Sequence, residues 1–211
     1  MDAHKPDKFR IGPVLLCIGG SAASIELMLQ AADLGLIGSP LWRNLAYQNG
    51  AFWPGLLRGW QPNYSAQPLT MFVTYAFLHG GFWHLAGNLL SLGVLAQIAA
   101  RHVGLGLFLF IYALSALGGA LCFALLPLGP QPMVGASGAL FGLAAAWQYW
   151  DYAGDQGHRR RRRLARGIGA LVGLNLVLWV AFGGALAWQT HLGGVLAGWL
   201  GAWLGHKMWG Q

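Results

Sequence analysis

Stretches of mostly apolar residues, each near the length needed to cross a lipid bilayer, recur along almost the whole chain. A transmembrane helix needs about 20 such residues. Six stretches meet or approach this length, at residues 11–37, 69–100, 104–126, 137–152, 164–182 and 186–209. Backbone groups inside hydrocarbon must find hydrogen-bond partners within the protein, so we expect each stretch to be a helix. The sequence therefore predicts an all-α membrane protein built as a bundle of six transmembrane helices.

The composition agrees with this class of protein. Of the 211 residues, 56% are hydrophobic and only 9% are charged, whereas soluble domains carry roughly 25% charged residues. We expect one membrane domain over residues 11–211, after a polar, cytoplasmic tail at residues 1–10. The 33 glycines suit helices that pack closely. Cys17 and Cys122 both lie in apolar stretches, so we expect no disulfide framework.

The segment between the first two spans, residues 38–68, contains four prolines and three tryptophans. The prolines make it too broken to cross a membrane as a helix. Tryptophan is typical of the membrane–water interface. We expect this first loop to lie in the interface.

The basic residues are distributed unevenly between the two sides that six spans would create. One side would hold 11 of the 13 lysines and arginines, and the other would hold only Arg43 and Arg58. The positive-inside rule then places both termini in the cytoplasm, which for a bacterial protein means the inner membrane. We expect a polar loop with Arg159–Arg163 before the fifth span, which sets the topology and meets anionic lipids. Topology explains the net charge of +7 better than nucleic-acid binding does, and no nucleic-acid partner is predicted.

The start of the chain allows one alternative. The basic residues of the tail, the apolar run at 11–18 and the small residues at 21–23 also resemble a signal peptide. Cleavage there would leave five spans in the same orientation.

Polar side chains inside a span are costly and suggest function. In the second span His84 and Asn88 are four residues apart, so they share one helical face. We expect both to lie about one to two turns in from the outer end of this span. His79 is expected before or at the helix start. The alternative is hydrogen bonding between helices. Two histidines without a carboxylate or thiol make a weak metal site, so no metal is predicted.

A second polar position is Ser137, which follows a proline-rich turn and opens the fourth span. Free N–H groups and the positive end of the helix dipole lie at such a helix start, and they favour a developing oxyanion. The alternative is ordinary packing, because a serine among glycines and alanines is common between membrane helices.

The third position is His191 in the sixth span, which shares a face with Gly194 and Gly198. Such a glycine strip lets a helix approach its neighbour closely. With six alternating spans, the starts of the second, fourth and sixth lie on the same side of the membrane. Ser137, His191, His84 and Asn88 could therefore meet in one cavity, and together they are the groups that acyl transfer requires.

These residues form three ordered motifs that resemble the rhomboid intramembrane proteases. The motifs are H-x4-H-x3-N in the second span, G-x-S-G opening the fourth, and H-x2-G-x3-G in the sixth. They lie within residues 69–205, which is most of the chain. The resemblance implies a six-helix rhomboid-like fold with an interfacial first loop.

The resemblance also implies a role for each residue of the motifs. Ser137 matches the nucleophile and His191 the general base of a Ser-His dyad, which needs no cofactor. His84 and Asn88 match the oxyanion-stabilising side chains. The remaining matches are supporting residues: His79, Gly135, Phe141, Gly194 and Gly198. Phe141 occupies the position of an aromatic ring that packs on the catalytic imidazole.

The chain departs from the family pattern at two places. Many relatives carry Trp-Arg shortly before the first histidine, where this chain has Thr70-Met71-Phe72. We expect Trp42-Arg43 to lie too far upstream to be equivalent. Many relatives also carry a glutamate deep in the second span, where this chain is apolar. Glu26 could anchor the first loop instead, or it could simply face water near the end of its span.

The resemblance implies a serine endopeptidase that cleaves transmembrane or membrane-proximal segments of membrane proteins. Its partners would be these substrates and the surrounding lipids. Two alternatives are a catalytically silent rhomboid-like protein that binds membrane clients and a small transporter. A silent relative would normally lack the serine or the histidine. A transporter would be expected to show inverted repeats or broken helices, and the sequence shows neither.

Overall fold

A computed structural model describes residues 10–126, 129–154 and 157–209. All but Arg10 of the polar tail lies outside these residues. The described chain is helical, and the extended pairing within it is an isolated antiparallel bridge between Phe52 and Met133. The protein is an all-α membrane bundle, as the sequence predicted.

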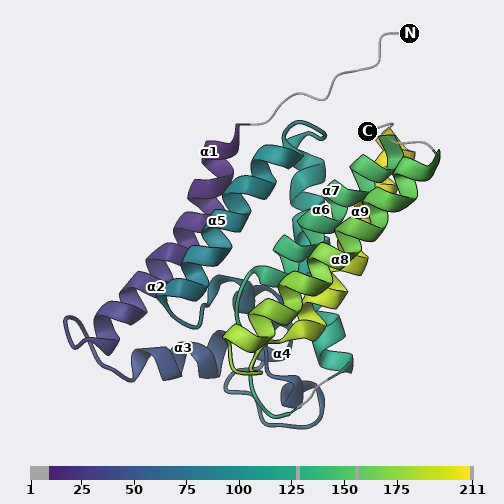
Figure 1. The fold of residues 1–211 in the computed structure, drawn as a ribbon. Helices are drawn as coiled ribbons and strands as arrows, with labels where there is room; N and C mark the ends of the chain where they lie inside the picture. Colours follow the sequence, from purple (N-terminus) through teal and green to yellow (C-terminus); the bar gives the residue numbers. More distant parts are fainter. Residues whose placement is uncertain (1–9, 127–128, 155–156, 210–211) are drawn as a thin grey trace.

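Within the described residues, six long helices form the bundle (Figure 1). The first is continuous from Ile11 to Asp33 and has three parts, α1 Ile11–Val14, the π-helical turn η1 Leu15–Gly19, and α2 Gly20–Asp33. The others are α5 Phe82–Ala99, α6 Leu105–Leu125, α7 Ser137–Gly154, α8 Gly157–Ala181 and α9 Trp188–Trp209. The first helix, α5, α6 and the Arg159–Ala181 part of α8 are long and apolar enough to cross a membrane. The other two, α7 and α9, pack extensively on each other, and α9 packs as extensively on α6.

In the structure the first loop extends from the end of α2 to the start of α5. It contains short helices: α3 Trp42–Gly50, η2 Pro54–Leu57, α4 Gln67–Thr74 and η3 Tyr75–Phe77. These elements gather at one end of the bundle, and α3 lies across the direction of the long helices (Figure 1). The start of α1 and the end of α9 lie at the opposite end (Figure 1).

The expected start of the second span at residue 69 is wrong. The helix there ends with η3 at Phe77, a turn follows, and α5 begins only at Phe82. The physical reason is Gly81, whose φ of 112° is incompatible with a right-handed helix. His84 is consequently the third residue of α5, closer to the helix start than expected, and His79 lies in the turn that precedes α5.

The expected polar loop at Arg159–Arg163 is also wrong, because these arginines belong to the first turns of α8. Arginine is a good helix former, so the helix can continue beyond its apolar part. The guanidinium carbon of Arg160 lies 3.7 Å from the centre of the Tyr152 ring at the end of α7. A cation–π contact thus joins the two helices at this end.

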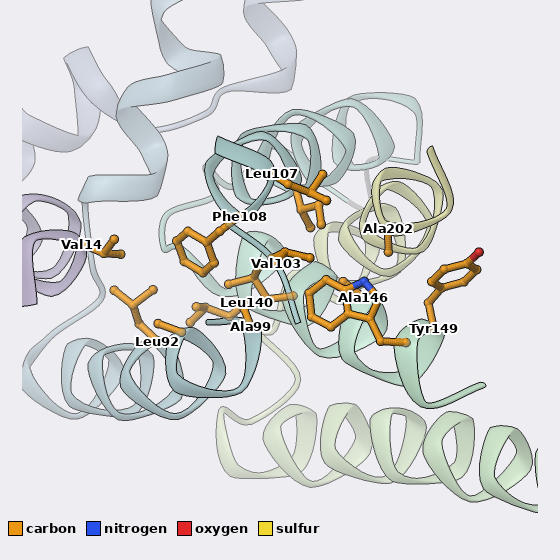
Figure 2. Packing of buried hydrophobic residues seen from close by; sticks show 14 residues of the cluster. Val14, Leu92, Ala99, Val103, Leu107, Phe108, Leu140, Ala146, Tyr149 and Ala202 are labelled. Carbon is orange, nitrogen blue, oxygen red and sulfur yellow. The ribbon is translucent and has the colours of Figure 1, made fainter. Parts of the chain in front are cut away.

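The core lies between the first helix, α5, α6, α7 and α9 (Figure 2). Its buried side chains include Val14 from the first helix, Leu92 from α5, Phe108 from α6 and Leu140 from α7. The most internal helix is α7, which buries side chains around nearly its whole circumference. Ser137, at the first position of α7, is thereby held on the most constrained element of the bundle.

Glycines bring α7 and α9 into backbone contact. A Cβ added to Gly194 would collide with the carbonyl of Gly138, and one added to Gly198 would collide with the backbone of Gly142. Only glycines allow this approach, which small residues commonly provide between membrane helices. Because the two helices run this close, a side chain near the start of α9 can reach the start of α7.

Candidate active site

Ser137 and His191 are in hydrogen-bond contact where α7 and α9 begin. The Oγ of Ser137 lies 2.8 Å from Nε2 of His191, although 53 residues separate them along the chain. His191 is only 2% exposed. The ring of Phe141, one turn below Ser137, stacks on the imidazole with centroids 4.0 Å apart and planes 6° from parallel. A hydroxyl, an imidazole nitrogen and a stacked aromatic ring thus lie together in a partly buried site.

The segment before Ser137 is held in place by the first loop. Phe52 and Met133 exchange two backbone hydrogen bonds, of 2.9 and 3.0 Å. The N–H of Gly135 donates to the carbonyl of Tyr75 over 2.9 Å. Gly135 has a φ of 115°, and a Cβ there would lie 2.7 Å from Cε1 of His84. This position requires glycine for its backbone conformation and for the closeness of the histidine.

His84 lines the same cavity as Ser137, and one of its ring nitrogens already accepts a hydrogen bond. The backbone N–H of Gly80 donates to its Nδ1 over 3.1 Å. In a neutral imidazole with an acceptor Nδ1, the proton resides on Nε2. That Nε2–H is then available as a donor toward the cavity.

Asn88 is buried one turn below His84, and its Nδ2 donates to the carbonyl of His84 over 2.7 Å. A carboxamide nitrogen carries two hydrogens, so one remains for a ligand. The first backbone N–H groups of α7, starting at Ser137, have no partner within their own helix. His84, Asn88 and Ser137 can together supply three donors.

A cavity of about 210 Å³ brings these groups together. Its polar lining includes Ser137, His191, His84 and Asn88. Leucines of α5, α7 and α8, together with Trp83 and Phe182, provide most of the remaining wall. A cluster of polar side chains thus lies in an otherwise apolar cavity, the arrangement expected of a small-molecule or peptide site.

The motifs did not point to Asn175, which lies in α8. Its Oδ1 is 2.7 Å from Nδ1 of His191, on the opposite edge of the ring from Ser137. A signal was present in the sequence, because Asn175 is the one charged or carboxamide residue within 167–181. Polar residues inside a span are functional hypotheses by default.

The water-facing alternative for Glu26 is wrong, and Arg43 contacts the histidine motif in space although it is far upstream in the sequence. Glu26 is 1% exposed, and its two carboxylate oxygens accept from Nη2 and Nη1 of Arg43 over 2.9 and 3.0 Å. Asp33 accepts from Nε of Arg43 over 2.6 Å. The hydrogen-bonded Glu26 carboxylate raises the pKa of Arg43 above its ordinary value. Arg43 lies far upstream of the histidine motif in sequence, but α3 folds back and places it beside that motif.

The ion pair is connected to His84 through a single peptide group. The carbonyl of His79 accepts from Nη1 of Arg43 over 3.2 Å and from the hydroxyl of Tyr47 over 2.6 Å. The N–H at the other end of the same peptide is that of Gly80, which donates to His84. Donors on the carbonyl polarise the peptide and strengthen its N–H as a donor. The first loop therefore holds the peptide that orients His84.

His79 does not line the cavity that contains Ser137 and His191. Its side chain is 1% exposed, and its ring centroid is 5.1 Å from that of His84. Burial lowers the pKa of His79 to about 4, so its ring is neutral near pH 7. Among the described residues, no group of three histidine, cysteine, aspartate or glutamate side chains is placed to bind a metal.

Comparison with known proteins identifies a matching family and several relatives of this chain. The model of the Rhomboid domain matches residues 66–208. Rhomboid protease GluP of Bacillus subtilis is 32% identical over 133 residues, which cover 62% of this chain and 25% of that protein. The mitochondrial Rhomboid protein 1 of Saccharomyces cerevisiae is 34% identical over 141 residues, covering 61% and 39%. RHOMBOID-like protein 5 of Arabidopsis thaliana is 40% identical over 75 residues, covering 35% and 24%. The matches span a quarter to two fifths of the length of these relatives.

Proposed function

This chain belongs to the rhomboid family, and from that premise we propose that it is an intramembrane serine endopeptidase with Ser137 as nucleophile and His191 as base. The observation that carries the proposal is the 2.8 Å contact between Oγ of Ser137 and Nε2 of His191. A hydrogen-bonded hydroxyl and imidazole at a helix N-terminus are the arrangement that activates a serine nucleophile.

In the proposed reaction, His191 removes the hydroxyl proton as Oγ of Ser137 attacks the peptide carbonyl. His191 then gives this proton to the leaving amine, and an acyl-enzyme remains. Water, deprotonated by His191, attacks the ester and releases the new carboxyl end together with the free serine. The same imidazole acts as base and then as acid in each half of the cycle.

The tetrahedral intermediate carries an oxyanion that needs preorganised donors. We assign this task to Nε2–H of His84, the remaining N–H of the Asn88 carboxamide and the backbone N–H of Ser137. The supporting groups have separate tasks: Phe141 holds the plane of the imidazole, Gly135 makes room for His84, and Gly194 and Gly198 keep α9 against α7.

The substrates we propose are transmembrane or membrane-proximal segments of membrane proteins. The apolar wall of the cavity suits such segments, and the polar end of α7 lies beside the first loop, where water can enter. A substrate helix must unwind to present its carbonyl to Ser137, so residues that weaken helices near the cut should favour cleavage. The lysine and arginine distribution favours cytoplasmic termini, so the site would open to the outer side of the membrane.

The decisive experiment uses the full chain purified in detergent. The substrate is a fluorogenic single-span peptide with a Gly-Gly pair near one end of its apolar segment. Ser137→Ala and His191→Ala should each abolish detectable cleavage, and a fluorophosphonate should label the parental protein but not Ser137→Ala. Ser24→Ala, which changes a serine on α2 away from the cavity, should cleave at the parental rate. Parental cleavage by Ser137→Ala would overturn Ser137 as the nucleophile. A parental protein that neither cleaves the peptide nor reacts with the fluorophosphonate would favour a client-binding role.

A further inference from the structure

The polar contact between α8 and α9 lies at the catalytic histidine. Oδ1 of Asn175 and Nδ1 of His191 are 2.7 Å apart, while Nε2 of the same ring contacts Ser137 over 2.8 Å. A carboxamide oxygen accepts hydrogen bonds and cannot donate them. With Oδ1 facing the ring, the imidazole proton must reside on Nδ1, and the lone pair of Nε2 faces the serine hydroxyl.

Stacking by Phe141 cannot determine which edge of the His191 imidazole faces Ser137. A ring 6° from parallel holds the plane of the imidazole, but rotation by 180° about Cβ–Cγ preserves that plane. The rotated ring would present carbon atoms in place of the nitrogens that now face Ser137 and Asn175. The hydrogen bond to Asn175 distinguishes these two orientations, since a carbon atom at that point would leave the carboxamide oxygen without its donor.

From this geometry we propose that Asn175 is a positioning residue that completes a Ser137–His191–Asn175 triad. The inference rests on the proposed protease function and deepens it. The carboxamide sets the tautomer and orientation of His191, and its oxygen stabilises the imidazolium formed when Ser137 attacks. An ionised carboxylate would do the same in water, but a charge within a transmembrane helix is costly. A neutral acceptor performs the task without that cost.

The helix α8 makes few buried contacts with the rest of the bundle, so its hydrogen bonds to α7 and α9 can be tested one at a time. Within its apolar part, the described side chains of α8 remain partly or fully accessible, in contrast to those of α7. A second polar contact holds α8 about two turns earlier, where Nε2 of Gln148 on α7 donates to the carbonyl of Gly167 over 3.1 Å. Gln148 therefore offers a matched control, because its removal loosens α8 without removing the acceptor at His191.

The test compares Asn175→Leu, Asn175→Asp and Gln148→Leu in the purified full chain, with the fluorogenic peptide and the fluorophosphonate as probes. Asn175→Leu has a similar size but no acceptor, and it should lower kcat about tenfold with little change in KM, the loss expected for one hydrogen bond of this kind. It should slow fluorophosphonate labelling of Ser137 by a similar factor. Gln148→Leu should keep the parental kcat and pH profile.

Asn175→Asp separates positioning from packing. It restores an acceptor at the same atom, so kcat should recover to within about threefold of the parental value at pH 8. Its charge favours the imidazolium, so the acidic limb of its pH–rate profile should move to higher pH. A purely structural role would instead let Asn175→Leu cleave normally and would leave the profile of Asn175→Asp unmoved.

The outcomes distinguish the two proposals. Parental cleavage that depends on Ser137 but is unaffected by Asn175→Leu overturns the triad and leaves the protease function standing. An equal loss of kcat in Gln148→Leu and Asn175→Leu also overturns the triad, since it would mean that the packing of α8 on the bundle causes the effect. A parental chain that neither cleaves nor reacts with fluorophosphonate overturns the protease function and the triad with it.

Discussion

Arg43 and Glu26 form a bidentate ion pair under the first loop, with N–O distances of 2.9 and 3.0 Å. Glu26 belongs to the first transmembrane helix and Arg43 to α3, so the ion pair connects the first loop to the helix bundle. Because Arg43 also donates to the carbonyl of His79, the same side chain connects the loop to the peptide that orients His84.

Removing Arg43 should strongly destabilise the protein. Arg43→Ala leaves the carboxylate of Glu26, 1% exposed, without its partner, and breaking a buried pair in this way costs about 3–5 kcal/mol. Thermal unfolding in detergent micelles measures the loss. The matched control is Asp33→Asn, which removes the other, more exposed carboxylate partner and should cost less than about 1 kcal/mol. Equal effects in the two variants would contradict the role of the buried pair.

A methyl group at Gly198 should separate Ser137 from His191. The added Cβ of Gly198→Ala would meet the backbone of Gly142, which cannot move aside as a flexible side chain could. We expect α9 to shift away from α7, cleavage to fall at least tenfold, and stability to fall by about 1–3 kcal/mol, the usual cost of overpacking. Gly106→Ala on α6, where the Cβ meets open space, should retain parental cleavage. A fully active Gly198→Ala would show that the helices tolerate a wider spacing.

Gly135→Ala should disturb His84, a proposed oxyanion donor, more than Ser137, the proposed nucleophile. Its φ of 115° is unfavourable for alanine, which costs about 1–3 kcal/mol, and the Cβ would push against His84. We expect a drop in kcat and slower fluorophosphonate labelling, with Ser137 still accessible. Gly93→Ala on α5, a glycine with open space around it, serves as the control. Unchanged kinetics in Gly135→Ala would exclude a tight fit between this backbone and His84.

His79 should make stability fall in mild acid. Its pKa is about 4 in the fold because of burial, against roughly 6.5 for an unfolded histidine. Between these values the unfolded chain binds a proton that the fold excludes, so stability rises with pH across this window and levels off above about 6.5. Thermal unfolding at pH 7 and pH 5 should show a smaller acid-induced loss for His79→Gln than for the parent. An identical loss in both proteins would mean that His79 is not the group that titrates.

The sequence alone determined the class of protein and the starts of the helices that carry Ser137 and His191. Apolar stretches of bilayer length force helices, since hydrocarbon offers the backbone no other partners. The alternation of six spans placed the starts of the second, fourth and sixth at one end, so the residues that meet in the cavity could be anticipated. Their catalytic roles stay predictions until the variants are measured.

Tertiary structure alone decided the contacts that depend on how helices face one another. Glu26 and Arg43 are 17 residues apart, with a helix end and a turn between them. Helical periodicity therefore cannot predict that they pair. In the sequence Asn175 is a single polar residue in an apolar span. Only the rotation of α8 about its axis in the folded chain places it against His191. The start of α5 could not be predicted because the apolar pattern continues through residues 69–82, whereas the backbone leaves the helix at Leu78 and Gly81, with its positive φ, directly precedes α5. Periodicity predicts where helices run, whereas pairing across the bundle depends on rotation and backbone geometry that only the folded chain defines.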